Sequence, residues 1–256
     1  MTKLNVAMTG RRADIHFHLL PGVDDGPATM EETVELARAA LRDGTAIVVA
    51  TPHIRRDFVT DPSNLPDLVQ EVRDRLARER IELDLHCGGE LGHDMVARLE
   101  QRDLETIAVG PSGASWILLE PPTEGPGEEL HQAADELRSR GFGVVLAHPE
   151  RSATLMADNA AGLRRELERG SLLQVNAWSL AGGHGAEAER MAIWLVGSGV
   201  VTALASDAHN GHRGPELSVG LQRASWGLAP HRARMLTDAA PRALIERGMP
   251  AAAHAA

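Results

Sequence analysis

Short apolar runs alternate along this chain with longer stretches in which apolar residues recur at helical spacing. The short runs are rich in Leu, Val and Ile and mostly lack a polar–apolar alternation, which is typical of strands buried on both faces. They predict strands at 13–17, 45–51, 81–88, 115–120, 143–148, 172–177 and 200–206. The helical spacing predicts helices at 29–44, 65–80, 128–141, 163–170, 188–199 and 231–248. Seven strand–helix units with no linker between them predict a parallel, barrel-like α/β fold.

The length and the two ends of the chain set the expected domain organisation. The chain has 256 residues, and we expect one domain over residues 1–248. The Ala-rich residues 249–256 are expected to form a frayed tail. No apolar run is long enough for a signal peptide or for the roughly 20 residues of a membrane span, so neither is predicted.

Composition narrows the classes of function. The formal net charge of −10 argues against broad binding to nucleic acid or anionic membranes, because both need a positive field. The single cysteine, Cys87, forms no intramolecular disulfide and favours a reducing compartment, so we expect a cytoplasmic protein. The only lysine is Lys3 and tyrosine is absent. Acid–base chemistry therefore falls to His, Asp, Glu, Arg or water.

Histidine and carboxylate side chains follow six of the seven predicted strands. The first strand carries two histidines one residue apart, whose rings point to the same face because the side-chain period of a strand is two. The carboxyl ends of parallel barrel strands open on one face, so the side chains there converge. The convergent residues are His16, His18, His53, Glu90, Glu120, His148, Asp207 and His209, and Asp25 joins them from the first loop. The sixth strand offers only Gln174 and Asn176.

This mixture of ligand types predicts a metal centre. Imidazole combined with carboxylate suits divalent ions such as Zn, Mn or Fe(II). Nine candidate ligands are too many for one ion, so two or three ions are expected. Clustered ions a few ångströms apart serve phosphoester hydrolysis, because they hold a hydroxide and stabilise the phosphate and leaving-group oxygens.

The motifs "DIHFHLLPGVDDG", "TPH", "GGE", "LLE", "AHPER" and "SDAHN" occur in this order between residue 13 and about 215. Together they resemble the polymerase-and-histidinol-phosphatase (PHP) superfamily. More narrowly, the chain resembles the manganese-dependent bacterial protein tyrosine phosphatases of capsule and exopolysaccharide operons, the CpsB/CapC type. The most telling local feature is the acidic pair followed by glycine and a Thr-capped, Glu-rich helix.

The resemblance implies a distorted seven-stranded, TIM-like β/α barrel with three metal ions, manganese first and iron or zinc as alternatives. It assigns one ion to His16, His18, Glu90 and Asp207. Glu90 would bridge to a second ion, which Glu120 and His148 also bind. The third ion would be held by Asp25, His53 and His209. A metal-bridging hydroxide would attack phosphorus without a phosphoenzyme. The implied substrate is a phosphotyrosine protein, a bacterial tyrosine kinase that controls polysaccharide assembly.

Four arginines are candidates for the grip on the phosphate, because a guanidinium binds phosphate oxygens bidentately. Arg151 and Arg213 occupy positions where the resembled family places phosphate-binding arginines, and they are the candidates for catalysis. Arg55 and Arg56, just after His53, are further substrate-binding candidates. Asp24 is interpreted as a loop carboxylate rather than a ligand. His184 lies in a Gly-rich loop; it could donate to a leaving group, although a plain loop histidine is the favoured interpretation.

Three other functions compete with a tyrosine phosphatase. A small-molecule phosphatase of the histidinol-phosphate type would share the metal ligands and act on a small phosphate ester. An amidohydrolase also begins with His-x-His, but it usually carries a bridging carboxylated lysine, which this chain does not supply. A non-catalytic PHP-like metal-binding domain is disfavoured because the ligand set is intact.

Overall fold

The computed structural model describes residues 12–125, 127–224 and 229–249. Its strands are β1 (Arg12–Phe17), β2 (Thr45–Ala50), β3 (His53–Ile54), β4 (Asp84–Cys87), β5 (Glu90–Gly92), β6 (Trp116–Glu120), β7 (Gly143–Leu146), β8 (Leu172–Asn176) and β9 (Ala203–Ala205). One sheet has the order β1-β2-β4 and the other β3-β5-β6-β7-β8-β9, and every pairing is parallel.

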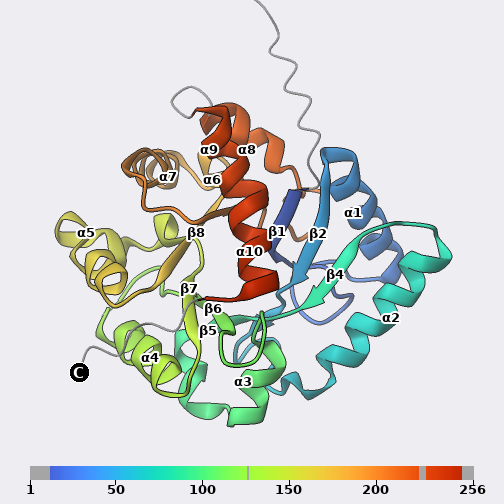
Figure 1. The fold of residues 1–256 in the computed structure, drawn as a ribbon, viewed down its shortest axis with the longest axis horizontal. Helices are drawn as coiled ribbons and strands as arrows, with labels where there is room; N and C mark the ends of the chain where they lie inside the picture. The colour runs from blue at the N-terminus through green and yellow to red at the C-terminus, as the bar shows by residue number, and fades with distance from the viewer. Residues whose placement is uncertain (1–11, 126, 225–228, 250–256) are drawn as a thin grey trace, which may run out of the picture.

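The first and last strands come together and curl the sheet. The backbone N–H of His18 donates to the carbonyl oxygen of Ala208 at 2.9 Å, and that of Asp207 donates to His16 at the same distance. Residues that are about 190 positions apart in sequence therefore become neighbours. The result is a curled parallel sheet of TIM-like type, as expected, with helices arranged around it (Figure 1).

The helices are α1 (Met30–Asp43), α2 (Leu65–Arg78), α3 (Gln101–Ile107), α4 (Glu128–Ser139), α5 (Ala153–Glu168), α6 (Ala177–Leu180), α7 (Ala186–Ser198), α8 (Leu217–Ala224), α9 (Pro230–Arg234) and α10 (Ala240–Arg247). Short 3-10 segments lie at Pro62–Asn64, His93–Arg98 and Pro149–Arg151, and a π turn at Met235–Ala239 joins α9 to α10. Within the described residues, no helix combines the length and the apolar character that crossing a membrane requires.

Both faces of the strands are buried, which explains the missing polar–apolar alternation. Along β6, Trp116 and Leu118 pack into one cluster, whereas Ile117 and Leu119 pack into another. The first cluster fills the inside of the curled sheet and includes Leu244 of α10, and the second lies under the outer helices. Helix α10 crosses the centre of the view in Figure 1, where the Trp116 indole donates to the Leu244 carbonyl oxygen at 3.0 Å.

Two predicted strands are interrupted in the structure. The strand expected at 45–51 stops at Ala50, and the short β3 resumes after Pro52, which has no N–H to donate. The strand expected at 81–88 is β4 alone, and β5 follows after Gly88 and Gly89. These breaks change the direction of the chain just before His53 and Glu90. They also raise the number of separate strand segments above seven.

Helix boundaries also differ from the prediction in places. Helices α3, α6 and α8 were not predicted, because four to eight residues are too few to display a helical period. Helix α5 begins ten residues earlier than expected and contains non-helical backbone at Ala157–Ala160. Of the predicted tail, Met249 is buried and the remaining residues lie outside the described part of the chain, as does Lys3.

Gly89 supplies a test of the close packing beneath Glu90. A Cβ there would lie 2.9 Å from Ile54 Cγ1 and 3.0 Å from Ile107 Cβ, so Gly89→Ala forces these side chains to move. We expect a loss of about 1–3 kcal/mol in the free energy of unfolding, measured by urea denaturation. Gly197→Ala is the control, because its Cβ meets nothing within 4 Å and lies in helix α7. Equal stability of Gly89→Ala and the parent would contradict this packing.

Candidate metal centre

All nine predicted ligands lie together at the carboxyl ends of the strands. They fall into four overlapping groups, in each of which one ligand atom per residue lies within 4.8 Å of the others. The groups are His18, Asp25, His53 and His209; His16, His18 and Asp207; His16, Glu90 and His148; and His53, Glu90 and Glu120. Asp25 is exposed and Glu120 half-buried, whereas the other seven residues are buried.

Two imidazole nitrogens lie at the middle of this cluster, and both are close to two carboxylates. His16 Nε2 lies 3.2 Å from His18 Nε2. Each of these two nitrogens lies 3.3–3.4 Å from Glu90 Oε2 and from Asp207 Oδ1. Imidazole and carboxylate are donors that divalent ions such as zinc or manganese accept together. The donor set and its close spacing therefore suit a divalent ion.

Several of these atoms lack any other partner. Glu90 Oε2, Asp207 Oδ1 and His209 Nε2 are buried and accept or donate no hydrogen bond within the described residues. Leaving a buried carboxylate oxygen unpaired is costly, and buried charges are normally paired or bound to a metal. His53 Nδ1 and Glu90 Oε2 lie 2.8 Å apart but do not form a hydrogen bond. A cation would satisfy these atoms together.

Further contacts extend the cluster on both sides of these four residues. On one side, the second oxygen of Glu90 lies 2.8 Å from His148 Nε2, so this carboxylate links two groups of ligands. On the other side, Asp25 Oδ1 lies 3.1 Å from His209 Nε2 and 3.5 Å from His53 Nε2. The carboxylate of Glu90 is therefore the centre of the cluster.

The titration of the cluster reflects both burial and crowding. Burial, reinforced by the neighbouring Glu90 carboxylate, raises the pKa of Glu120 to about 7. Burial lowers the pKa of His18, but the nearby carboxylates of Asp207 and Asp24 outweigh it and hold that pKa well above its usual value. Without cations, the carboxylates are thus balanced by protons on neighbouring groups.

Polar residues that the sequence prediction set aside orient the ligands. Asp24 Oδ2 lies 2.7 Å from His18 Nδ1 and accepts the His53 backbone N–H at 2.9 Å. Such a carboxylate–imidazole contact fixes the ring and its tautomer in metal sites. Asp24 is thus not in any ligand group, as expected, but it is more than a loop carboxylate. In the sequence, this role was indicated by the position of Asp24 and Asp25 in a tight loop just after the His-x-His strand.

The sixth predicted strand, β8, contributes in the same way. Gln174 Oε1 lies 3.0 Å from His16 Nδ1 and accepts the His148 backbone N–H at 3.1 Å. The amide of Asn176 donates to Asp207 Oδ2 at 2.6 Å. The Gln-x-Asn pattern at the end of this strand is therefore the counterpart of the ligand patterns on its neighbours.

Two of the ligands adopt backbone conformations that non-glycine residues rarely take. His148 has a φ of 30° and Asp207 a φ of 53°. Such conformations cost free energy and cluster at functional sites. In both cases the strand has just ended, and the turn directs the side chain inward to the cluster. This strain is an independent mark of a functional position.

The four candidate arginines are placed differently. Arg213 Nη2 lies 2.6 Å and Arg151 Nη1 3.1 Å from the same oxygen, Asp207 Oδ2, so both guanidiniums border the cluster. Arg55 reaches its edge, 3.5 Å from Glu120 Oε2, while also pairing with Asp57. The structure does not bring Arg56 to the cluster: its side chain is 61% exposed and pairs with Asp94 at 3.0 Å.

Cys87 does not take part. Its Sγ contacts the Thr106 carbonyl oxygen at 3.7 Å, and it packs against the hydrophobic core. Burial raises the pKa of its thiol to about 11, so it stays protonated at neutral pH.

The parallel α/β fold and the ligand cluster at its strand ends define a TIM-like protein with clusters of His, Asp and Glu able to bind metal. The family model described as "Capsular polysaccharide synthesis, CpsB/CapC" matches residues 12–246, and the chain belongs to this family. The resemblance seen in the motifs is thereby confirmed.

Individual relatives agree with the family match. The chain is 31% identical over 198 residues to the tyrosine-protein phosphatase YwqE of Bacillus subtilis, which covers 77% of each chain. It is 28% identical over 200 residues to a putative tyrosine-protein phosphatase, CapC, of Staphylococcus aureus, covering 77% of this chain and 76% of CapC. The chain also superposes on a crystal structure from work on YwqE and on CpsB of Streptococcus pneumoniae, which are described as "unique metal-dependent tyrosine phosphatases". The TM-score is 0.76 and the sequence identity 28%, over 88% of this chain and 90% of the other.

Removal of one imidazole tests the metal centre. We expect His148→Ala to lose at least one bound ion after manganese loading, because its Nε2 forms a group of three candidate ligands with His16 and Glu90. Metal content is measured by elemental analysis of the desalted protein, and turnover should be almost abolished. His93→Ala, which removes an imidazole outside the four groups, should keep the full metal content. A full complement of metal in His148→Ala would rule out its role as a ligand.

Proposed function

We propose that this protein is a metal-dependent protein tyrosine phosphatase that acts on a phosphotyrosine protein of polysaccharide assembly, a bacterial tyrosine kinase. One observation carries the proposal: two arginines converge on Asp207 at the edge of a cluster with metal-ligand spacing. Guanidinium groups beside clustered divalent ions are suited to a phosphate dianion. The curated relatives that are named as tyrosine-protein phosphatases support the choice of substrate.

The proposal includes the nine ligands and their division among three ions as the resemblance implies. Manganese is the first candidate, and iron or zinc are alternatives. The mixed imidazole and carboxylate donors support any of these ions. When bound, divalent ions at this cluster supply a hydroxide nucleophile and neutralise charge on the phosphate oxygens.

The protein's own side chains bind and orient the substrate in this proposal. Arg151 and Arg213 grip the phosphate oxygens, and Arg55 assists from the side of Glu120. Asp24, Gln174 and Asn176 hold the ligands in place through the contacts described above. The net charge of −10 favours a protein substrate over nucleic acid, which would need a positive field.

The finer architecture is also part of the proposal. We interpret β2 with β3, and β4 with β5, as two interrupted strands of a distorted seven-stranded barrel that forms one domain. A cytoplasmic setting agrees with the single cysteine and with a kinase substrate in the same compartment.

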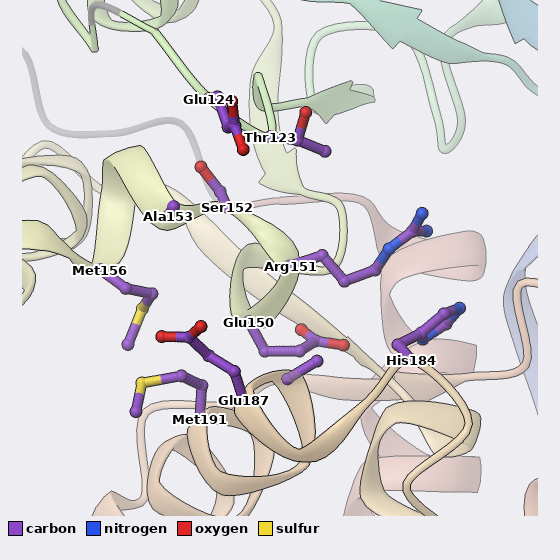
Figure 2. A pocket seen from close by; sticks show the side chains of 11 residues that line it. Thr123, Glu124, Glu150, Arg151, Ser152, Ala153, Met156, His184, Glu187 and Met191 are labelled. Carbon is purple, nitrogen blue, oxygen red and sulfur yellow. The ribbon is translucent and has the colours of Figure 1, made fainter.

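A small-molecule phosphatase of the histidinol-phosphate type is the second candidate. A cavity of about 370 Å³ adjoins the cluster through Arg151, and three carboxylates line it: Glu124, Glu150 and Glu187 (Figure 2). Acidic walls beside a phosphate site suit a phosphate ester that also carries an amine or imidazole. This feature was not evident from the sequence.

A substrate panel separates the two candidates. Manganese-loaded protein is assayed on phosphotyrosine peptides, phosphoserine peptides and histidinol phosphate, with and without a chelator. We expect manganese-dependent hydrolysis with the highest kcat/KM on phosphotyrosine peptides, and loss of activity with chelator. A preference for histidinol phosphate would favour the second candidate. Metal-loaded protein that hydrolyses none of the esters would refute both.

Arg213 tests the grip on phosphate. We expect Arg213→Ala to lower kcat/KM for a phosphotyrosine peptide by about 10²-fold, because a charge-assisted contact to the phosphate is lost. Metal content should stay at the parental level, which elemental analysis checks. Arg38→Ala, which removes an arginine that pairs with Glu79 on the surface, should leave kcat/KM unchanged. Loss of metal in Arg213→Ala would instead assign it a role in holding Asp207.

A further inference from the structure

His184 is held in a fixed position beside the candidate phosphate site. It lies in the turn between α6 and α7, and α6 itself directly follows β8. Its Nδ1 lies 2.8 Å from Ser179 Oγ, and its ring meets Trp178 edge-on with centroids 5.0 Å apart. A Cβ on Gly183 would lie 2.3 Å from the Trp178 ring, so the turn is closed around this indole. The imidazole is therefore rigidly placed.

The other ring nitrogen has no partner. His184 Nε2 is buried and forms no hydrogen bond with any described residue. The ring lines the cavity of about 370 Å³, as does Arg151 (Figure 2). Figure 2 shows Arg151 and His184 projecting to the same side of this cavity, with Met156 and Met191 at the opposite end. An unpaired ring nitrogen thus lies next to the arginine that borders the ligand cluster.

The charge state of the ring follows from its surroundings. Burial lowers the pKa of His184 to about 3, and the positive charge of Arg151 acts in the same direction. The imidazole is therefore neutral at neutral pH. In the tautomer in which Ser179 donates its O–H to Nδ1, the single ring hydrogen lies on Nε2.

Hydrolysis of a tyrosine phosphate creates a need for such a donor. The tyrosine hydroxyl has a pKa near 10, so its phenolate is a poor leaving group. The chain has no tyrosine, and within the described residues it has no lysine. Arg151 and Arg213 are engaged with Asp207 and are assigned to the phosphate. In the tautomer described above, His184 adds to the cavity lining a neutral ring N–H that has no other partner among the described residues.

We propose that His184 donates a hydrogen bond from Nε2 to the leaving oxygen of the aryl phosphate, with the aromatic ring of the substrate in the adjoining cavity. This proposal rests on the tyrosine phosphatase function proposed above. A water-derived oxygen forms a bond to phosphorus, and the bond from phosphorus to the aryl oxygen breaks with its electron pair on that oxygen. The Nε2–H group stabilises the developing negative charge, and solvent then protonates the phenolate. His184 remains neutral throughout, and Ser179 is its positioning residue.

Leaving-group dependence tests this role, because a purely structural histidine would not alter it. The manganese-loaded parent, His184→Ala, His184→Gln and Ser179→Ala are compared on phenyl phosphate, a poor leaving group, and on p-nitrophenyl phosphate, whose phenolate needs little stabilisation. His86→Ala is the matched control, because this histidine lies on β4 and contacts Asp84. Elemental analysis verifies that all variants retain parental metal content.

We expect His184→Ala to lower kcat/KM on phenyl phosphate about 10²-fold, and on p-nitrophenyl phosphate by less than roughly 10-fold. His184→Gln should recover part of the loss on phenyl phosphate, because its amide N–H can donate. Ser179→Ala should also lower kcat/KM more on phenyl phosphate than on p-nitrophenyl phosphate, but by smaller factors than His184→Ala. Equal losses on both esters, or a Gln variant no better than Ala, would overturn the proposal.

The outcome also separates this inference from the function on which it rests. One outcome is that the parent hydrolyses phosphotyrosine peptides and both aryl esters while His184→Ala loses kcat/KM by the same factor on the two esters. In that case only the proposed role of His184 is refuted. If the metal-loaded parent hydrolyses none of them, the proposed function fails and the role of His184 with it.

Discussion

The arrangement of this protein depends on buried negative charge that the polypeptide alone does not satisfy. Glu90 and Asp207 lie in the interior, each with one buried oxygen atom that accepts no hydrogen bond within the described residues, and imidazole nitrogens lie around them. Taking carboxylates out of water is costly unless they are paired or bound to cations. The fold therefore maintains a concentration of negative charge that a bound cation would neutralise.

The rest of the structure can be understood as support for that charge. Each strand end brings one or two groups to a common centre, and the strand without a ligand, β8, supplies amides that hold its neighbours. The strained backbone at His148 and Asp207 aims two ligands that an ordinary strand end would direct elsewhere. Packing inside the curled sheet, from Trp116 to Leu244, provides the rigidity that these strained turns require.

The sequence predicted the site best where candidate ligand residues follow the two-residue period of a strand. His16 and His18 lie two residues apart on a buried strand, and parallel strands share one open end, so the convergence of ligands followed from simple geometry. The breaks before His53 and Glu90 did not follow, because they depend on how Pro52 and the paired glycines pack against other segments. The positions of Arg56 and Asp24 were equally hidden, since each depends on which partner the folded chain brings near.

Helix α10 and the hydrogen bonds between the end of β1 and the residues after β9 have a consequence for how the protein folds during its synthesis. The ligands His16 and His18 are synthesised first, whereas Asp207 and His209 follow about 190 residues later, and α10, which adds Leu244 to the cluster around Trp116, comes after them. Contacts between such distant segments close slowly, because a long loop must be ordered first. The nascent chain therefore carries His16 and His18 without their partners from the last strand for most of its synthesis, and the candidate metal centre can assemble only after that strand is made.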